Sequence, residues 1–210
     1  VLHKSQEELE MLARKKVKHL YLGIESGLDD VLKFMKKDHD LAQAYQAIDR
    51  LHEAGLIYDA HIMTGVAGKG RGMENAEALA QFLNRTNPAH VVNFSMFLHK
   101  EVPLYQDIRQ GTFVPADELE TIREEYHLIE RIAPEKAGAN ILYDGFHDFI
   151  HVRVRGHLPG DKEKMLAKLN GIIQEYEGKE PVYSFVQGEC PDLEYCDDGK
   201  AVWDMDRKTS

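Results

Sequence analysis

Apolar residues recur along the chain with two different spacings, and these predict helices that alternate with short buried strands. In residues 41–54 they fall every three or four positions, at Leu41, Tyr45, Ile48 and Leu51, which places them on one face of a helix. Other segments are short continuous apolar runs, typical of parallel strands that are covered on both faces. In chain order the pattern predicts a helix from Ser5, a strand at 17–24, helices at 28–35 and 41–54, a strand at 56–63, a helix at 73–85, a strand at 90–98 and a helix at 116–132.

Polar residues and glycine mark where several of these elements begin and end. Ser5 and Glu8 form a capping-box pattern, in which each side chain accepts a hydrogen bond from a free backbone N–H group. Asp40 can cap the helix that follows it, and Gly55 can end that helix in a left-handed turn. The local signals therefore agree with the apolar periodicity.

Alternating strands and helices predict an α/β fold with a parallel sheet and right-handed crossovers. Three strands are too few for a closed barrel and would leave two open edges. Either strands from the second half of the chain cover these edges, or another half of the barrel has been removed. We expect a partial parallel (β/α) barrel, half of one, over residues 1–133. Residues 134–210 are predicted to form an α+β extension, whose strands can cover one of those edges. Its expected elements are strands at 141–143 and 148–154, a helix at about 161–177 and an acidic tail that contains Trp203.

The composition of the chain reduces the number of function classes that fit it. The 210 residues carry a net charge of −10, which argues against a nucleic-acid partner because such proteins usually present a basic patch. No apolar run approaches the roughly 20 residues of a membrane helix, and no signal peptide is evident. The two cysteines, Cys190 and Cys196, fit a reducing compartment, so we expect a cytoplasmic protein. The chain begins at Val1 directly before helical sequence, and we interpret it as a fragment.

The first strand ends in polar residues that suggest a binding site. Glu25 and Ser26 follow the apolar run, and ligands in α/β folds bind at the carboxyl ends of strands. A carboxylate can accept hydrogen bonds from two hydroxyl groups or from an ammonium group, and a serine hydroxyl can both donate and accept. The alternative is that Glu25 caps the following helix, where its charge is favoured by the helix dipole.

Three segments in the expected order resemble the radical S-adenosylmethionine (radical SAM) enzymes. "YLGIESGLDDVLKFMKK" resembles the fourth strand of that family and the helix after it, and "AGLIYDAHIMTGVAGKG" is similar to the fifth strand and its glycine loop. "NPAHVVNFSMFLHKEVPLYQDIRQGTF" resembles the sixth strand and the loop that follows, and "HLPGDKEKMLAKL" looks like a segment downstream of the barrel in an uncharacterised iron–sulfur oxidoreductase branch. The resemblance covers about residues 5–177 and implies the C-terminal half of a partial TIM barrel.

The resemblance also has departures that shape the prediction. The family's Cys-x-x-x-Cys-x-x-Cys motif is absent, and the fifth- and sixth-strand loops lack a proline and a Pro-Gly pair. The intact parent is therefore expected to use S-adenosylmethionine and a 4Fe–4S cluster whose ligands are not in this chain. This chain is expected to contribute part of the cofactor and substrate site, to pair with the missing N-terminal half and to be inactive alone. The alternative is a non-catalytic α/β binding or interaction module, and the substrate is not predicted.

The resemblance and the strand ends together give the candidate cofactor-binding residues. Besides Glu25, three of these residues have an ordinary structural alternative: a helix-end lysine in solvent for Lys37, a turn for Gly65 and a core position for Phe97. A metal site of histidines such as His61 and His90 is disfavoured because no His-x-His pair occurs, and the "GKGRG" loop lacks the spacing of a phosphate-binding loop. The complete candidate set is Glu25, Ser26, Lys37, Gly65, Ser95 and Phe97.

Overall fold

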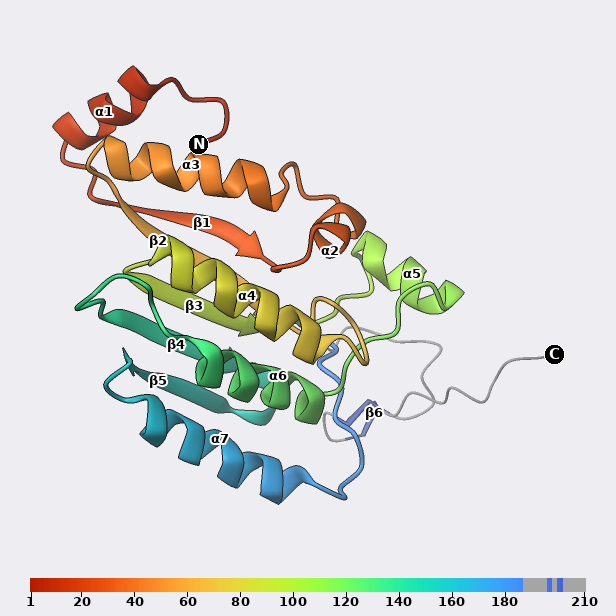
Figure 1. The fold of residues 1–210 in the computed structure, drawn as a ribbon. Coiled ribbons are helices and arrows are strands. Elements are labelled where there is room, and N and C mark those ends of the chain that lie inside the picture. The colour runs from red at the N-terminus through yellow and green to blue at the C-terminus, as the bar shows by residue number, and fades with distance from the viewer. Residues whose placement is uncertain (187–195, 198–199, 202–210) are drawn as a thin grey trace.

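The helices and strands follow the predicted order in the structure, a computed structural model that describes residues 1–186, 196–197 and 200–201 (Figure 1). One helix, α5, was not predicted, and it begins at Pro103, a residue favoured in the first turn of a helix. The helices are α1 (Gln6–Arg14), α2 (Asp29–Phe34), α3 (Leu41–Glu53), α4 (Gly72–Thr86), α5 (Pro103–Gln110), α6 (Glu118–Arg131) and α7 (Lys162–Tyr176). The strands are β1 (His19–Glu25), β2 (Ile57–Thr64), β3 (His90–Ser95), β4 (Ile141–His147), β5 (Val152–Leu158), β6 (Cys196–Asp197) and β7 (Lys200–Ala201).

Strands β1 to β5 form one sheet in sequence order, which confirms the predicted α/β class. Strands β1 to β4 run parallel, and β5 is antiparallel to β4. Strand β4 pairs along β3, so the second half of the chain covers one edge of the first three strands, which is one of the two alternatives left open by the sequence. Strand β1 lies at the other end of the sheet. The division at residue 133 remains a prediction, and β4 and β5 extend the same sheet as β1 to β3.

The predicted bounds of the last two strands of this sheet were wrong. Strand β4 continues to His147, beyond the expected end at residue 143, and residues 148–150 form a 3₁₀ turn where a strand was expected. His151 then adopts a left-handed conformation with φ of 54°, which reverses the chain into β5. The helix expected at about 161–177 is confirmed as α7. Cys190 and Trp203, together with most of the acidic tail, lie outside the described residues.

Helices α3, α4, α6 and α7 all lie against the same face of the sheet (Figure 1). The core between these two layers includes Leu51, Tyr58, Leu79, Ile122 and Tyr143, each of which is at most 1% exposed. The capping box at Ser5, the Asp40 cap and the left-handed Gly55 are confirmed. Within the described part of the chain, no helix is long and apolar enough to cross a membrane.

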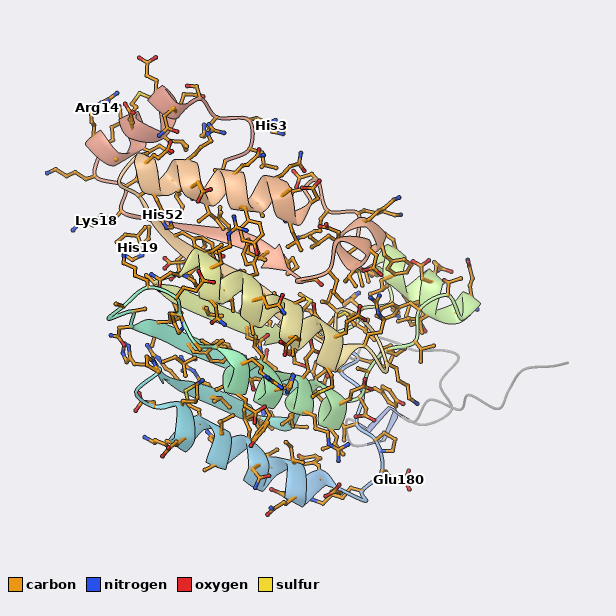
Figure 2. All side chains as sticks on the ribbon, in the orientation of Figure 1. His3, Arg14, Lys18, His19, His52 and Glu180 are labelled. Carbon is orange, nitrogen blue, oxygen red and sulfur yellow. The ribbon has the colours of Figure 1, made fainter. Side chains whose placement is uncertain are left out.

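The opposite face of the sheet carries polar and aromatic residues in cross-strand rows. The strand register pairs Tyr21 of β1 with Asp59 of β2, and the ring of His90, the first residue of β3, packs edge-on against Tyr21. Tyr21 is 51% exposed, and its hydroxyl lies 2.9 Å from Nδ1 of His90. Figure 2 shows His19, whose Nδ1 lies 2.7 Å from Oδ2 of the buried Asp59, at the end of the sheet where β1 begins. Because this face is polar and partly exposed, it differs from the apolar face that packs on the helices.

Close contact between β1 and α4 depends on Gly27. A Cβ atom at this position would lie 2.4 Å from the backbone nitrogen of Leu79 and 2.5 Å from the carbonyl carbon of Ala78. We predict that Gly27→Ala lowers the free energy of unfolding by about 1–3 kcal/mol, because backbone atoms cannot move aside as a flexible side chain can.

A matched glycine supplies the control for this prediction. Gly171 lies within α7, and a Cβ there would meet nothing within 4 Å. Gly171→Ala should therefore stabilise the protein by about 0.5–1 kcal/mol, because alanine is the better helix former. Urea denaturation of both variants measures the two effects, and equal stability changes would contradict the role of Gly27.

Candidate functional site

The candidate site lies where β1, β2 and β3 end, beside the loops that follow them. Glu25, the last residue of β1, has φ of 62°, a left-handed conformation that is uncommon for residues other than glycine. The pairing of β1 with β2 also shifts between Gly23 and Glu25, so the end of the strand is irregular. Such local strain occurs often at binding sites, where the surrounding structure holds it in place.

Glu25 and Lys37 form an ion pair at this edge. Nζ of Lys37 donates a hydrogen bond of 2.9 Å to Oε1 of Glu25, and the two side chains are 32% and 21% exposed, respectively. The pair therefore brings together two predicted site residues that are 12 positions apart. One bond uses one of the two carboxylate oxygens and one of the three ammonium hydrogens, so both groups retain hydrogen-bonding capacity.

Ser26 has a different position from the one that a direct ligand contact requires. It is fully buried, and its hydroxyl donates a bond of 2.6 Å to Oδ1 of Asn75 in α4. The same hydroxyl accepts a bond from the backbone nitrogen of Leu28, the N-cap residue of α2. Ser26, rather than Glu25, thus satisfies a backbone donor at the start of α2, and the capping alternative for Glu25 was wrong.

The three remaining predicted residues lie at the ends of β2 and β3 but differ in exposure. Gly65 has φ of 82°, and its backbone nitrogen donates to Oε2 of Glu124 at 2.8 Å. Ser95 is buried, with its hydroxyl 3.2 Å from Oε1 of Glu118. Phe97 is 52% exposed, so the core alternative for this residue was wrong and its ring is available for contact.

Three carboxylates of α6 were missed by the sequence analysis, although they organise this whole edge. Glu118, Glu124 and Glu125 are each at most 1% exposed and lie between α6 and the sheet. In the sequence they look like the solvated face of an acidic helix, and the apolar residues beside them gave the same helix a plausible inner face. Buried acids need hydrogen-bond donors or positive charge nearby, and both are present here.

His147 at the end of β4 supplies the positive charge. Its Nδ1 lies 3.0 Å from Oε2 of Glu118, and its Nε2 lies 3.0 Å from Oε2 of Glu125. Burial alone would lower the pKa of His147, but the two carboxylates outweigh burial and raise that pKa to about 10. Both ring nitrogens must donate, since ionised carboxylates only accept, so the imidazole ring is positively charged at neutral pH.

Further donors complete the satisfaction of these acids. Glu125 also accepts hydrogen bonds from Nδ2 of Asn93 at 3.1 Å and from the hydroxyl of Tyr143 at 2.9 Å. The hydroxyl of Ser184, from the segment after α7, donates to Glu118. Burial raises the pKa of Glu118, but His147, Ser184 and Ser95 together outweigh burial and leave that pKa below its ordinary value. This cluster of buried acids and His147 is closed to solvent. Its role is therefore structural, and it holds the strand ends in place.

A cavity of about 360 Å³ lies beside the loop that follows β2. The stacked rings of Phe34 and Phe113 line it, together with Lys69 and Arg71 of the "GKGRG" segment. The Arg71 guanidinium already binds the carboxylates of Asp30 and Glu74. Because these two acids neutralise Arg71, the loop lacks the cluster of free donors that a phosphate group would require.

Histidines on the open face do not form a metal centre in the described residues. No group of three or more histidine, cysteine, aspartate or glutamate residues in residues 1–186 is arranged to hold a metal ion. His61 instead packs edge-on against Tyr21 and Phe94. His90 contacts Tyr21 through both its ring and its Nδ1 atom.

Comparison with known proteins agrees with this fold. Residues 1–83, which include β1, β2 and the loops after them, match the family described as the Radical SAM superfamily. A tRNA uridine(34) acetyltransferase of Methanocaldococcus infernus is 25% identical over 119 residues, or 56% of this chain and 22% of that protein. The solved structure of Methanocaldococcus infernus Elp3 with an N-terminal deletion shares 18% identity, with a TM-score of 0.60 over 81% of this chain and 39% of that one.

The strand order, the polar strand ends and the family match define a radical SAM-type α/β protein. This chain matches the Radical SAM superfamily over 83 of its 210 residues, the part that holds β1 and β2. It spans less than half the length of the two proteins it was compared with.

The charged state of His147 predicts a pH dependence of stability. Its pKa is about 10 in the folded protein and near 6.5 for an unperturbed histidine. The stabilisation is thus fully present below pH 6.5 and is lost as the pH rises through 10. Burial raises the pKa of Glu124 to about 8, which acts in the same direction but at lower pH. We therefore expect the free energy of unfolding to fall further between pH 8 and 10, as measured by denaturant titration.

His147→Gln tests the assignment of this pH dependence. The variant should lose about 3–5 kcal/mol of stability at pH 7, because two buried carboxylates lose their positive partner, and it should lack the fall between pH 8 and 10. His52→Gln, at an exposed position of α3, is the matched control and should keep the wild-type pH profile. A wild-type profile in His147→Gln would contradict the proposed charge state.

Proposed function

We propose that this chain is the C-terminal portion of a radical SAM iron–sulfur enzyme and forms part of its S-adenosylmethionine site and substrate site. The observation that carries the proposal is the partly exposed Glu25–Lys37 pair at the carboxyl end of β1. An amino acid moiety carries one ammonium and one carboxylate group. Glu25 can accept from the ammonium group or from ribose hydroxyls, and Lys37 can donate to the carboxylate. The residues present therefore fit this cofactor.

The residues present do not fit the 4Fe–4S cluster. The chain has two cysteines, Cys190 and Cys196, which are fewer than the three of the family motif and differ from it in spacing. We infer that the cluster ligands belong to an N-terminal half that pairs along β1, the strand at the end of the sheet. When bound, cluster and cofactor together supply a 5′-deoxyadenosyl radical, and this chemistry belongs to the cofactors rather than to the protein.

The open face of the sheet is the proposed substrate wall. It presents Tyr21 and His90 and, nearer the strand ends, the stacked rings of Phe94 and Phe146. Pairing of a further half along β1 would enclose this face, because the helices lie on the other side (Figure 1). The relative with 25% identity is named as an acetyltransferase, but this chain covers 22% of it, so the proposal stops at the radical SAM portion. Within that portion, an oxidoreductase reaction in the cytoplasm remains our proposal.

We predict that the 210-residue chain alone will not assemble a 4Fe–4S cluster. Anaerobic reconstitution with iron and sulfide should leave the protein without the brown charge-transfer absorbance, because too few thiolate ligands are present. The full-length parent, treated in the same way, is the positive control. Stoichiometric cluster uptake by the chain, with formation of 5′-deoxyadenosine, would overturn the assignment of the ligands to another segment.

The cofactor role of Glu25 predicts a selective loss of affinity. In the reconstituted full-length parent, Glu25→Gln keeps the side-chain shape but removes the charge. A hydrogen bond to a charged group contributes roughly 1.5–3 kcal/mol, so the affinity for S-adenosylmethionine should fall about 10- to 150-fold. Calorimetric titration measures the affinity of both proteins.

Glu53→Gln is the matched control, since it removes the same charge from an exposed position in α3. It should leave the affinity unchanged. If Glu25→Gln binds the cofactor as tightly as the wild type, Glu25 is not a cofactor ligand and the Lys37 pair has a structural role alone.

A further inference from the structure

The loops after β1 and β2 are tied to the same buried side chain, Glu124 of α6. Its Oε2 accepts a hydrogen bond of 2.8 Å from the backbone nitrogen of Gly65, directly after β2. Its Oε1 accepts a bond of 2.7 Å from Nδ2 of Asn75 in α4. Glu124 is 1% exposed, so both bonds are shielded from water and neither donor has solvent as a substitute partner.

Asn75 links Glu124 to the loop after β1. Its Oδ1 accepts from the hydroxyl of Ser26 at 2.6 Å and from the backbone nitrogen of Gly27 at 3.1 Å. Because these two donors fix the carbonyl side of the amide, its NH₂ group must point at Glu124. The chain of hydrogen bonds therefore has one direction, and it ends on the Glu124 carboxyl group.

This direction explains why position 124 needs an acid rather than an amide. A carboxylate accepts from both donors at once. A protonated carboxyl group can also do so, because its hydroxyl oxygen keeps a lone pair. A glutamine would instead turn an NH₂ group, which cannot accept, toward either Gly65 or Asn75. One buried donor would then lack a partner, whatever the protonation state of the native acid.

We infer that Glu124 is a positioning residue, which holds the loops after β1 and β2 in one conformation and thereby fixes where Glu25 stands. Ser26, the residue next to Glu25, is the link between this network and the exposed ion pair with Lys37. The effect on Glu25 as a ligand rests on the proposed function. The effect on the loops does not, because it follows from the hydrogen bonds of this chain.

The test exchanges the acid and the amide. In Glu124→Gln, hydrogen exchange at the backbone amides of Gly65 and Gly27 should speed up by about 10-fold or more, since a buried donor loses its partner. In the double variant Asn75→Asp with Glu124→Gln, the new aspartate accepts from Ser26, from Gly27 and from the glutamine NH₂ group. The glutamine oxygen then accepts from Gly65. This swap satisfies every donor again, so protection of both amides should return to within about threefold of wild type.

Ile129→Val is the control, because it shortens a buried side chain of the same helix without touching this network. It should lower global stability and leave the ratio of Gly65 protection to that of other core amides unchanged. The inference is overturned if Glu124→Gln leaves the Gly65 and Gly27 amides as protected as in wild type, or if the double variant is no better than the single one.

A second measurement separates this inference from the proposed function. In the reconstituted full-length parent, the affinity for S-adenosylmethionine should fall about 10-fold in Glu124→Gln and recover in the double variant. If the amides respond and are rescued while the affinity stays constant, Glu124 still positions the loops and the cofactor assignment fails.

Discussion

The carboxyl edge of the sheet depends on the burial of three acids from one helix. An unpaired carboxylate cannot remain buried at reasonable cost, so each of these side chains dictates what surrounds it. Glu118 and Glu125 share the charged ring of His147, whereas Glu124 receives neutral donors from Gly65 and Asn75. Since those partners come from α4, β2 and β4, a single helix fixes the relative positions of elements that are far apart in the sequence.

This arrangement explains how an exposed site can be built on a strained strand end. The left-handed conformation of Glu25 has an energetic cost, and its partly exposed ion pair with Lys37 does little to offset that cost. The adjacent Ser26 is anchored in the buried network, and Gly27 lets the chain approach α4 closely. The buried network beneath the surface is thus the rigid part of the site, and it supports the groups that are available to a ligand.

The elements that could be predicted from the sequence are those with local causes. Apolar spacing and capping residues determine α1 and α3 almost unaided, because their signals lie within a few positions of one another, and apolar spacing determines most of α4. The strands of the first half were also found, and their parallel order followed from the alternation. Strand β4 was cut short because its second half reads "DGFH", whose burial depends on Glu125: Gly145 is the residue whose missing Cβ makes room for that carboxylate.

The site shows the same division between local and tertiary information. The strand-end position of Glu25 and its nearness to Lys37 were accessible, since both follow from one strand and the next helix. The inward orientation of the Ser26 side chain could not be predicted, because it depends on Asn75, which is 49 positions away. The acids of α6 were hidden for a related reason: a buried glutamate and a solvated one look alike in sequence, and donors from other elements alone distinguish them.

The side chains that can still bind a ligand are therefore those whose hydrogen-bonding groups are not already used within the protein. Between the sheet and the helices, serine, asparagine, tyrosine and histidine side chains form hydrogen bonds with the α6 carboxylates and cannot also bind a ligand. On the open face and at the ends of β1 and β3, Tyr21, the Glu25–Lys37 pair and Phe97 keep exposed surface or unused hydrogen-bonding capacity. The fold thus separates a buried polar layer that sets geometry from an exposed layer that can meet a cofactor, and Ser26 and Glu25 are the adjacent residues where the two layers join.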